Sequence, residues 1–528
     1  MLFRSPYPDV TIPDVPLTPF VLELAGKLSD KPALIDGPSG RTLTYGQLAD
    51  AIRSAAAGLA SRGFGKGQVT AIYSPNLPEY AVAFHAVATV GGVNTTVNPL
   101  YTADELARQL EDCRATCLLT VPPLLAKARE AAGRAGVKEL FVFGQAEGAT
   151  PFGELLQPGE PPEVQLDPAE DLVALPYSSG TTGLPKGVML THRNLVANIV
   201  QTDCAADVSD WVTPNDTLIG LLPFFHIYGM LVIMNLALYK GATIVTMPRF
   251  DFEQFLQTLQ SYRVTVAHLV PPIVLALAKH PIVDRFDLSA LKLINSGAAP
   301  LSDDLTRACA ERVGCTVTQG YGMTETSPVT HVNASANAAR KPGSIGRPIP
   351  NTECRIVDPA TEAELGPGQA GELLVRGPQV MKGYLNQPEA TAAMIDADGW
   401  LRTGDVVYAD AEGDFYVVDR VKELIKYKGY QVPPAELEAL LLTHPAVADC
   451  AVIPVPDEEA GEAPKAYVVL KGDASADALI EFVAERVAPY KKLRAVELTD
   501  QIPKSASGKI LRRVLVERER ARASPASS

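Results

Sequence analysis

Short apolar runs alternate with amphipathic stretches from about residue 40 to residue 330. The runs at 69–76, 115–121 and 139–144 are rich in Val, Ile, Leu and Thr, which is typical of buried strands. Helical patterns lie between such runs, as in "PLLAKAREAAGRAG". This alternation predicts an α/β fold with mostly parallel sheets, in which ligands lie at the carboxyl ends of the strands.

The pattern changes after about residue 340, where Gly and Pro become dense and the apolar runs shorten. We interpret residues 340–420 as a β-rich subdomain. From residue 421 to residue 528, helical and strand-like stretches again alternate, with enough apolar positions for a separate core. The sequence therefore predicts a large N-terminal domain over 1–420 and a small α+β C-terminal domain over 421–528.

Composition narrows the possible partners. The 528 residues are 47% hydrophobic and 20% charged, with a formal net charge of −14, as in globular proteins. Such a charge argues against broad binding to nucleic acid or to an anionic membrane, because both need a basic face. It leaves room for a local cationic pocket that binds a small anion.

The distribution of cysteines and apolar residues bears on location. Seven scattered cysteines without a CxxC pair favour a reducing compartment over a disulfide framework or a zinc site. The N-terminal segment has no signal-peptide pattern. The longest apolar stretch, 229–239, falls well short of the roughly 20 residues of a membrane span. We expect a cytoplasmic protein that does not cross a membrane and is a monomer or weak homo-oligomer.

The clearest chemical motif is "YSSGTTGLPKGVMLTH" at 177–192. Its Gly, Ser and Thr residues leave backbone N–H groups and hydroxyls accessible to an anion, and Lys186 adds a positive charge. The order of residues is not that of a Walker A loop, GxxxxGK[ST]. A Gly-rich loop is usually only a turn, but this length and order of residue types favour a phosphate-binding loop.

Two further motifs follow predicted strands. In "QGYGMTET" (319–326), Thr324 offers a hydroxyl and Glu325 offers oxygen ligands of the kind that Mg²⁺ prefers. In "GWLRTGD" (399–405), Asp405 at the end of a strand or turn could accept hydrogen bonds from ribose hydroxyls. Taken alone, each carboxylate also fits a solvated loop residue.

Two basic segments lie nearer the C-terminus. Arg420, Lys422, Lys426 and Lys428 fall within "DRVKELIKYKGYQVPPAELE", a run that by itself is more typical of a solvated face. Lys509 lies on a Gly-containing loop in "PKSASGKILRR".

These motifs together resemble the adenylate-forming acyl-CoA synthetases, and among them look most like the 4-coumarate–CoA ligases. The resemblance rests on residues 177–513, where the motifs occur in the family's order, and it is looser before them. Its carriers are "YSSGTTGLPKGVMLTH", "LPFFHIYG", "SGAAPL", "QGYGMTE", "GELLVRGPQVMKGY", "GWLRTGD", "VDRVKELIKYKGYQV" and "PKSASGKILRR". The resemblance implies that a carboxylic acid attacks the α-phosphate of ATP, and that the thiol of coenzyme A then displaces AMP from the acyl-adenylate.

The resemblance also implies roles for residues of the nucleotide site. The phosphate loop would comprise Ser178, Ser179, Gly180, Thr181, Thr182, Gly183 and Lys186. Thr324 would contact the α-phosphate and Glu325 would bind Mg²⁺. Contacts to adenosine would come from Gln319, Gly320, Tyr321, Asp405 and Arg420.

The small domain is implied to rotate between the two half-reactions about a hinge at Lys422. Lys509 would bridge the carboxylate and the α-phosphate during adenylation, where a preorganised cation is commonly worth about 10²–10³ in rate. The other residues matched on this side are Lys426 and Gln431 near the AMP phosphate, Lys428 and Gly429 near pantetheine, and Arg249 at the CoA phosphate. Arg249 stands where many relatives have lysine.

The resemblance implies that the acid binds beside His226. Without the resemblance, a histidine in an apolar run is more often a core residue. The matched pocket residues are Tyr228, Val232, Gly297, Ala298, Gly320, Pro328 and Val329. Small residues at 297, 298 and 320 leave room for a flat ring. Val232 is apolar where plant enzymes carry serine, and "SPVTH" departs from the commoner Gly-Pro start of its segment.

The favoured reading is a hydroxycinnamate or cinnamate–CoA ligase that uses ATP, Mg²⁺ and coenzyme A. A medium- or long-chain fatty-acid–CoA ligase and a stand-alone adenylation protein that loads a carrier thiol remain alternatives. Lys428 and Arg249 speak mildly against carrier loading. A nucleotide-binding regulator without turnover is disfavoured, because a mere binder has little use for Lys186, Glu325 and Lys509 together.

Overall fold

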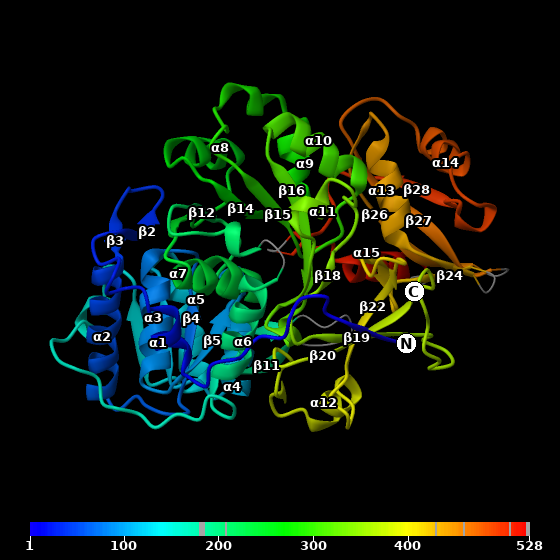
Figure 1. The fold of residues 1–528 in the computed structure, drawn as a ribbon. Helices are drawn as coiled ribbons and strands as arrows, with labels where there is room; N and C mark the ends of the chain where they lie inside the picture. The colour runs from blue at the N-terminus through cyan, green and yellow to red at the C-terminus, as the bar shows by residue number, and fades with distance from the viewer. Residues whose placement is uncertain (179–184, 206–207, 428–429, 458–459, 506–507, 524–528) are drawn as a thin grey trace, which may run out of the picture.

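The structure, a computed structural model, describes residues 1–528 except 179–184, 206–207, 428–429, 458–459, 506–507 and 524–528. The described residues form four sheets (Figure 1). Two of these sheets have nine strands each and two have five.

The first nine-stranded sheet has the order β10-β11-β9-β5-β4-β6-β7-β8, and β21 pairs with β11. The bounds in that order are Tyr177–Ser178, Lys186–Thr191, Leu172–Ala174, Val93–Val97, Val69–Tyr73, Cys117–Thr120, Glu139–Val142 and Thr150–Pro151, with β21 at Gly383–Tyr384. Strands β9 to β8 are parallel, whereas β10, β11 and β21 pair antiparallel. Alternation along β4 directs Ile72 into the main core and Ala71 and Tyr73 toward helices α4 (Ala103–Asp112) and α5 (Leu125–Ala135).

The second nine-stranded sheet has the order β18-β17-β16-β15-β14-β12-β13-β2-β3. The bounds in that order are Arg347–Pro348, Val329–Val332, Thr316–Gly322, Leu293–Ser296, Val266–Leu269, Thr217–Gly220, Thr243–Thr246, Pro32–Asp36 and Thr42–Thr44. Pairing is parallel from β16 to β2 and antiparallel at both edges. Helices α8 (Phe252–Ser261), α9 (Pro271–Lys279) and α10 (Asp303–Val313) lie along its outer side, at the top of Figure 1.

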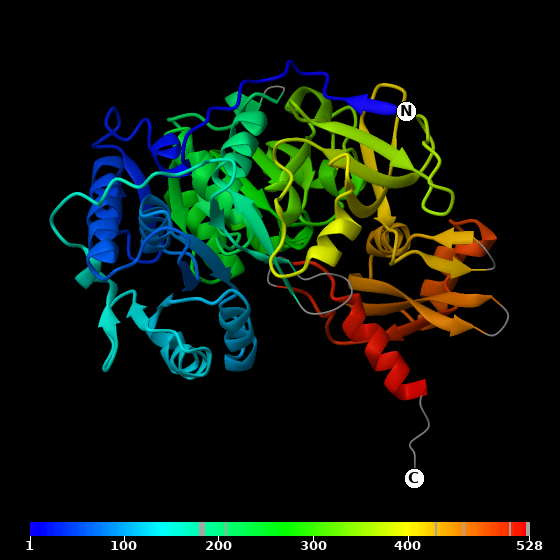
Figure 2. The same ribbon diagram turned by 90° about the horizontal axis from the view of Figure 1, so that it is seen from below.

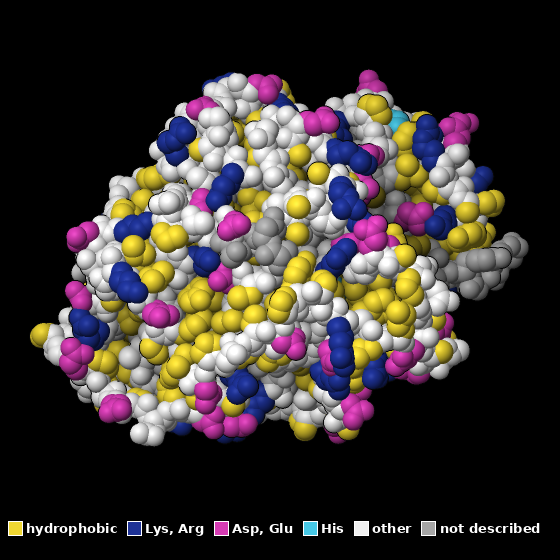
Figure 3. Space-filling view, in the orientation of Figure 1, with side chains coloured by type: hydrophobic (Ala, Val, Ile, Leu, Met, Phe, Trp, Pro, Cys, Tyr) yellow, Lys and Arg dark blue, Asp and Glu magenta, His cyan; other side chains and the backbone are white. Residues whose placement is uncertain are grey.

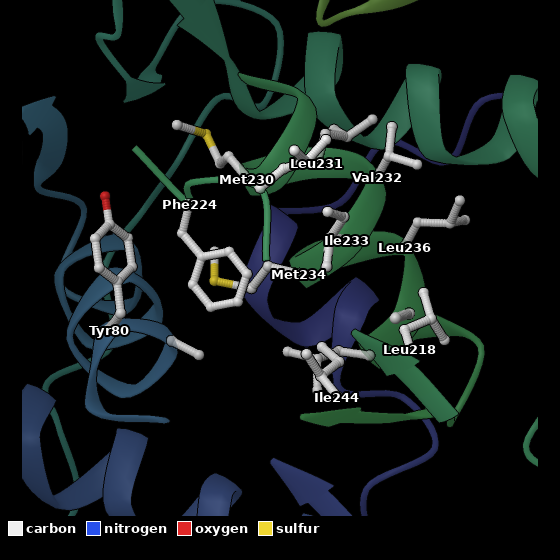
Figure 4. Close-up of a cluster of buried hydrophobic side chains, with 14 of the residues drawn as sticks. Tyr80, Leu218, Phe224, Met230, Leu231, Val232, Ile233, Met234, Leu236 and Ile244 are labelled. Carbon is white, nitrogen blue, oxygen red and sulfur yellow. The ribbon is translucent and has the colours of Figure 1, made fainter. Parts of the chain in front are cut away.

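One large core joins the two nine-stranded sheets. Besides α8, α9 and α10, the helices that contribute to it include α1 (Leu17–Val21), α2 (Tyr45–Ser61), α3 (Pro78–Thr89), α6 (His192–Asp203), the π-helix η4 (Tyr228–Asn235) and α7 (Leu236–Tyr239). Figure 4 shows the rings of Tyr80 and Phe224 facing each other, with centroids 5.8 Å apart in an edge-to-face arrangement. Val232 lies farther along η4, away from that pair (Figure 4).

Local signals explain where several of these helices begin. Thr44, Thr102 and Thr191 each cap a helix, and the residue three positions later completes a capping box. Helix α9 begins with two prolines, whose missing N–H groups cost nothing in the first turn.

The third sheet is antiparallel, in the order β1-β19-β20-β22-β23. The bounds are Leu2–Arg4, Glu353–Val357, Gly371–Arg376, Leu401–Ala409 and Phe415–Arg420, and helix α12 covers Pro388–Met394. Strand β1 at the N-terminus was not predicted. It has three residues and therefore too few positions to show an alternating pattern.

The fourth sheet lies wholly in the C-terminal part, in the order β25-β24-β27-β26 with β28 paired to β27. The strands are Tyr430–Val432, Ile425–Tyr427, Gly461–Leu470, Val447–Asp457 and Ala495–Leu498, and the helices are α13 (Pro434–Thr443), α14 (Ala476–Ala484) and α15 (Arg512–Ala523). This unit, orange to red in Figure 2, lies beside the yellow strands of the third sheet, and the red segment before α15 runs back toward the green body.

The α/β fold with parallel sheets, a β-rich part and a smaller α+β unit is confirmed. The division at 420/421 stays a prediction. Within the described residues, no helix combines the length and apolar character that crossing a membrane requires.

Candidate active site

The described ends of the Gly/Ser/Thr motif lie in two paired strands. Ser178 in β10 pairs antiparallel with Lys186, the first residue of β11, and the two strands β10 and β11 are called the hairpin below. Ser179, Gly180, Thr181, Thr182 and Gly183 lie outside the described residues. Strand β11 occupies the second part of the motif and leads directly into α6, which begins at His192.

Glu325 is brought to this hairpin from a different sheet. It lies in a short 3₁₀ turn, Thr324–Thr326, directly after β16, and its side chain is buried. Its Oε1 accepts hydrogen bonds from Ser178 Oγ at 2.9 Å and from Tyr384 Oη at 2.8 Å. Lys186 Nζ lies 4.7 Å from the centroid of the Tyr384 ring. One tyrosine therefore contacts both the candidate metal ligand and the candidate phosphate-binding cation.

The donor set around Glu325 fits Mg²⁺. Both of the hydroxyls that contact its carboxylate donate to Oε1, so Oε2 is the carboxylate oxygen to which neither of them donates. Mg²⁺ takes oxygen ligands and commonly uses one or two carboxylates together with substrate phosphates. Thr324, half-buried, precedes Glu325 and supplies a further hydroxyl.

Asp405 forms a second polar group, at the third sheet. It is paired across β22 and β23 with Arg420, whose Nε lies 3.3 Å from Asp405 Oδ1. Tyr321 at the end of β16 donates its hydroxyl to Asp405 Oδ2 at 2.6 Å. Burial and the Asp405 charge hold the pKa of Tyr321 well above its usual value, so Tyr321 stays a donor. Asp405 lies inside a nine-residue strand and not at a strand or turn end as predicted.

Gln319 supports the neighbouring loop with its side chain. Its Oε1 accepts from Leu301 N at 2.9 Å, and its Nε2 donates to Leu301 O at 3.0 Å and to Pro342 O at 2.8 Å. The amide group is thus used inside the protein. Gly320 lies beside it in β16, and Ala298 in the supported loop has a positive φ of 68°, a conformation that costs an alanine about 1–2 kcal/mol.

The candidate acid site has Tyr228 at its centre. The Tyr228 hydroxyl donates to Asn295 O at 3.2 Å and lies 3.2 Å from His268 Nδ1. A Cβ at Gly297 would lie 2.7 Å from the Tyr228 ring, so only glycine allows the ring this position. Of the other predicted pocket residues, Val232 and Pro328 are buried and Val329 is partly buried.

Lys509 reaches the large unit from the C-terminal unit. A Cβ at Gly508, which has a φ of +77°, would lie 3.1 Å from Val270 Cγ2, so this loop packs against the start of α9. Burial, and next the Arg420 charge, lower the pKa of Lys509 to about 8, although Glu423 and Asp405 oppose the shift. Burial and the Lys509 ammonium together lower the pKa of His226 to about 4. Lys509 therefore lies within electrostatic reach of both His226 and Asp405.

Arg512, three residues after Lys509, anchors this loop within the C-terminal unit. Its guanidinium contacts Glu423, and its Nη2 lies 2.6 Å from Glu438 Oε2. Its Nε donates to Val452 O at 3.2 Å. The sequence analysis did not single out this buried cluster, because its members are far apart in the chain.

The other residues predicted on this side are Lys422 at the hinge, Lys426 and Gln431 near the AMP phosphate, and Lys428, Gly429 and Arg249 at coenzyme A, and their roles stay predictions. Lys422 and Lys426 are exposed, and the backbone N–H of Lys426 donates to Glu462 Oε2 at 2.8 Å. Gln431 pairs with Lys426 through the backbone, and Lys428 and Gly429 lie outside the described residues. Arg249 is exposed just after β13.

The sequence analysis also missed Tyr384 as a residue of the site. The motif that contains it, "GELLVRGPQVMKGY", was recognised only as part of the family resemblance. Its place became visible only when β21 was found paired to β11, which brings residue 384 beside residue 188.

Comparisons with known proteins show the family of this chain. The family model described as "AMP-binding enzyme" matches residues 22–385, and "AMP-binding enzyme C-terminal domain" matches residues 436–509. The chain is 43% identical over 524 residues to 4-coumarate–CoA ligase 2 of Petroselinum crispum, covering 98% of this chain and 96% of the relative. It is 44% identical over 523 residues to 4-coumarate–CoA ligase 5 of Oryza sativa subsp. japonica, covering 97% and 96%.

Solved structures with the same fold include an acyl-AMP complex, an ATP complex and a structure without ligand. The anthranilate CoA ligase AuaEII in complex with anthranoyl-AMP superposes with a TM-score of 0.90 at 25% identity, covering 97% of this chain and 99% of that one. ATP-bound MatB from Rhodopseudomonas palustris superposes with a TM-score of 0.85 at 30% identity, covering 95% and 98%. Apo MatB gives 0.76 at 30% identity, covering 96% and 99%.

Proposed function

This chain belongs to the AMP-binding enzymes, and on that premise we propose that its acid substrate is a hydroxycinnamate or cinnamate of the 4-coumarate type. It is an AMP-forming acid–thiol ligase that uses ATP, Mg²⁺ and coenzyme A. The carboxylate attacks the α-phosphate of ATP and releases pyrophosphate, and the CoA thiol then attacks the acyl-adenylate and releases AMP.

On the phosphate side, the proposal assigns the hairpin loop and Lys186 to the β- and γ-phosphates and Thr324 to the α-phosphate. Glu325 would hold Mg²⁺, which offsets phosphate charge when bound. Asp405 would accept hydrogen bonds from the ribose hydroxyls. The short contacts that Asp405 makes with Tyr321 and Arg420 support this role, because they hold its carboxylate in one orientation.

On the acid side, Lys509 would bring the two anions together. Its ammonium stabilises the negative charge that gathers on the pentavalent phosphorus as the carboxylate oxygen attacks. His226, neutral at physiological pH because of its lowered pKa, would lie beside the acyl carboxylate without adding positive charge. The contact of Gly508 with Val270 supports the assignment, since it holds the lysine loop against the large unit.

One observation carries the choice of acid: the relatives that match almost the whole chain at 43–44% identity are 4-coumarate–CoA ligases. The Tyr228 ring itself fills the space beside Gly297, and it adds an aromatic side chain to the candidate acid pocket, as is common in pockets for small organic ligands. We further propose that residues 1–420 form the large domain and that 421–528 rotate between the half-reactions. The predicted cytoplasmic location and the oligomeric state stay predictions.

The test incubates the protein with Mg-ATP and coenzyme A and, separately, cinnamate, 4-coumarate, caffeate, octanoate or palmitate. We expect AMP and thioester to form fastest with one of the three aromatic acids. Palmitate exceeding every aromatic acid would overturn the choice of substrate. Acyl-adenylate without CoA thioester would instead favour loading of a carrier-protein thiol.

A further inference from the structure

Tyr384 occupies a place in the ATP site that none of the predicted roles covers. It is 5% exposed, and its hydroxyl and its ring make different contacts. The hydroxyl donates to Glu325 Oε1 at 2.8 Å, and the ring faces Lys186 Nζ at 4.7 Å from its centroid. These two partners come from different sheets and carry opposite charges.

The backbone holds Tyr384 firmly in this place. In β21 it pairs with Val188 of β11, and its N–H donates to Thr391 Oγ1 at 2.9 Å, at α12. The next residue, Leu385, donates its N–H to Gly187 O at 2.8 Å. The ring is therefore tied to the strand that begins with Lys186, so it follows the phosphate-binding hairpin.

The hydrogen bond between Tyr384 and Glu325 has a fixed direction. A carboxylate oxygen accepts hydrogen bonds, so the Tyr384 hydroxyl is the donor to Glu325 Oε1. The donated bond occupies Oε1 together with that from Ser178, which leaves Oε2 as the oxygen of Glu325 to which neither hydroxyl donates.

We propose that Tyr384 is a positioning residue that orients Glu325 toward the metal and holds Lys186 at the phosphates, so that one side chain sets the geometry of both. This inference rests on the proposed function, because it takes Glu325 as the Mg²⁺ ligand. Groups that orient a metal ligand typically change metal affinity by about 10- to 100-fold when they are lost. A cation over an aromatic face contributes a smaller, separable effect.

Two substitutions separate the hydroxyl from the ring. Tyr384→Phe removes only the hydroxyl, so Mn²⁺ affinity of the enzyme–ATP complex, followed by electron paramagnetic resonance, should fall about tenfold. Binding of fluorescent mant-ATP without metal should change less than about twofold, because the ring remains under Lys186. Tyr384→Leu removes the ring as well and should also weaken metal-free mant-ATP binding by roughly three- to tenfold.

Kinetics supply a second signature. For Tyr384→Phe, the Mg²⁺ concentration for half-maximal adenylation should rise about tenfold, while kcat at saturating Mg²⁺ falls much less. Thioester formation from supplied acyl-AMP should be unchanged, since that step involves neither the metal nor the β- and γ-phosphates. This second step also verifies that the variant is folded.

Tyr177→Phe is the matched control. Its hydroxyl donates to Asp112 Oδ2 at 2.6 Å, on the same hairpin but away from Glu325. Mn²⁺ affinity should be unchanged in this variant. An equal loss in Tyr177→Phe, or unchanged Mn²⁺ affinity in Tyr384→Phe, would overturn the proposal.

If Tyr384→Phe loses both half-reactions through misfolding, Ser178→Ala replaces it. That change removes the second hydroxyl that donates to Glu325 Oε1 and leaves the Tyr384 ring in place. Mn²⁺ affinity should fall in this variant too, and an unchanged affinity would count against the proposal. The binding measurements need no acid substrate, so they judge Tyr384 even if wild-type protein were to activate none of the acids and the proposed function failed.

Discussion

The phosphate side of the site and the Lys509 side differ in what holds them together. Ser178, Glu325 and Tyr384 come from three segments, but strand pairing and direct hydrogen bonds join them within the large unit. Lys509 belongs to the other unit, and it meets the large unit through the packing of Gly508 on Val270 and through charge. The first group is assembled by the fold itself, whereas the second depends on how the two units dock.

This difference predicts which half-reaction each region controls. The residues of the phosphate side should contact bound ATP in any position of the C-terminal unit. Lys509 should matter only while the C-terminal unit is docked as it is here, so changes near it should separate adenylation from thioester formation.

The largest expected effect is that of Lys509→Ala. Removing a preorganised cation from the reacting groups should slow acyl-adenylate formation by about 10²–10³-fold. Thioester formation from supplied acyl-AMP should be largely retained. Stopped-flow or quench-flow measurement of each half-reaction checks this.

Lys504→Ala is the matched control for Lys509→Ala. Lys504 lies close to Lys509 in the sequence, but its Nζ forms an ion pair with Asp449 Oδ2 at 2.6 Å. Adenylation should be nearly normal in this variant. An equal loss of both half-reactions in Lys509→Ala would contradict the assignment of Lys509 to adenylation alone.

The next effect tests docking without removing the lysine. Gly508→Val would place a branched side chain against Val270 and at a φ of +77° that suits glycine. Displacing Lys509 by about 1 Å can cost up to about 10²-fold in adenylation. We expect the acyl-AMP step to survive, as judged by thioester formation. Normal adenylation in Gly508→Val would mean that this contact does not hold the lysine.

A smaller effect should appear in the pH profile. Since Lys509 has a pKa of about 8 and acts as the ammonium, kcat/KM for adenylation should be full below pH 8 and fall above it, approaching tenfold per pH unit. The acyl-AMP step should lack this alkaline limb. Lys509→Arg should move the limb to higher pH, because guanidinium stays charged. A limb that stayed in place in Lys509→Arg would assign it to another group.

The smallest effect concerns the acid pocket of the large unit. Val232→Ser would add a hydroxyl to a buried, apolar position of η4. One hydrogen bond to a ring hydroxyl should change the ratio of kcat/KM for 4-coumarate over cinnamate by about fivefold. Competition between the two acids measures that ratio directly. An unchanged ratio would place Val232 away from the ring.

The predicted α/β architecture follows from local patterns, and so do most of its strands and helices. The runs at 69–76, 115–121 and 139–144 are strands because buried parallel strands carry continuous apolar sequence. Strand β11 was missed because "KGVMLT" follows a Gly-rich segment and precedes a capped helix, and its apolar run of three residues is too short to predict a strand.

Residues of the site were predictable where a motif carries them, and less so where only the fold joins them. Lys186, Glu325, Asp405 and Lys509 stand in recognisable motifs. In the structure Tyr384 contacts both Lys186 and Glu325, and Lys509 lies within electrostatic reach of Asp405. The links between them, Tyr384 and the cluster around Arg512, depend on strand pairs and contacts across long separations in sequence. On the face shown in Figure 3, acidic and basic side chains are interspersed.

The most direct test of the central claim, that the hairpin of the large unit and Lys509 of the C-terminal unit act on one triphosphate, is exchange of labelled pyrophosphate into ATP. The wild-type protein should catalyse exchange only when a carboxylic acid such as 4-coumarate is present. Lys186→Ala and Lys509→Ala should each lower it by about 10²-fold or more. Exchange at the wild-type rate in either variant, or no exchange by wild-type protein with any acid offered, would contradict the account.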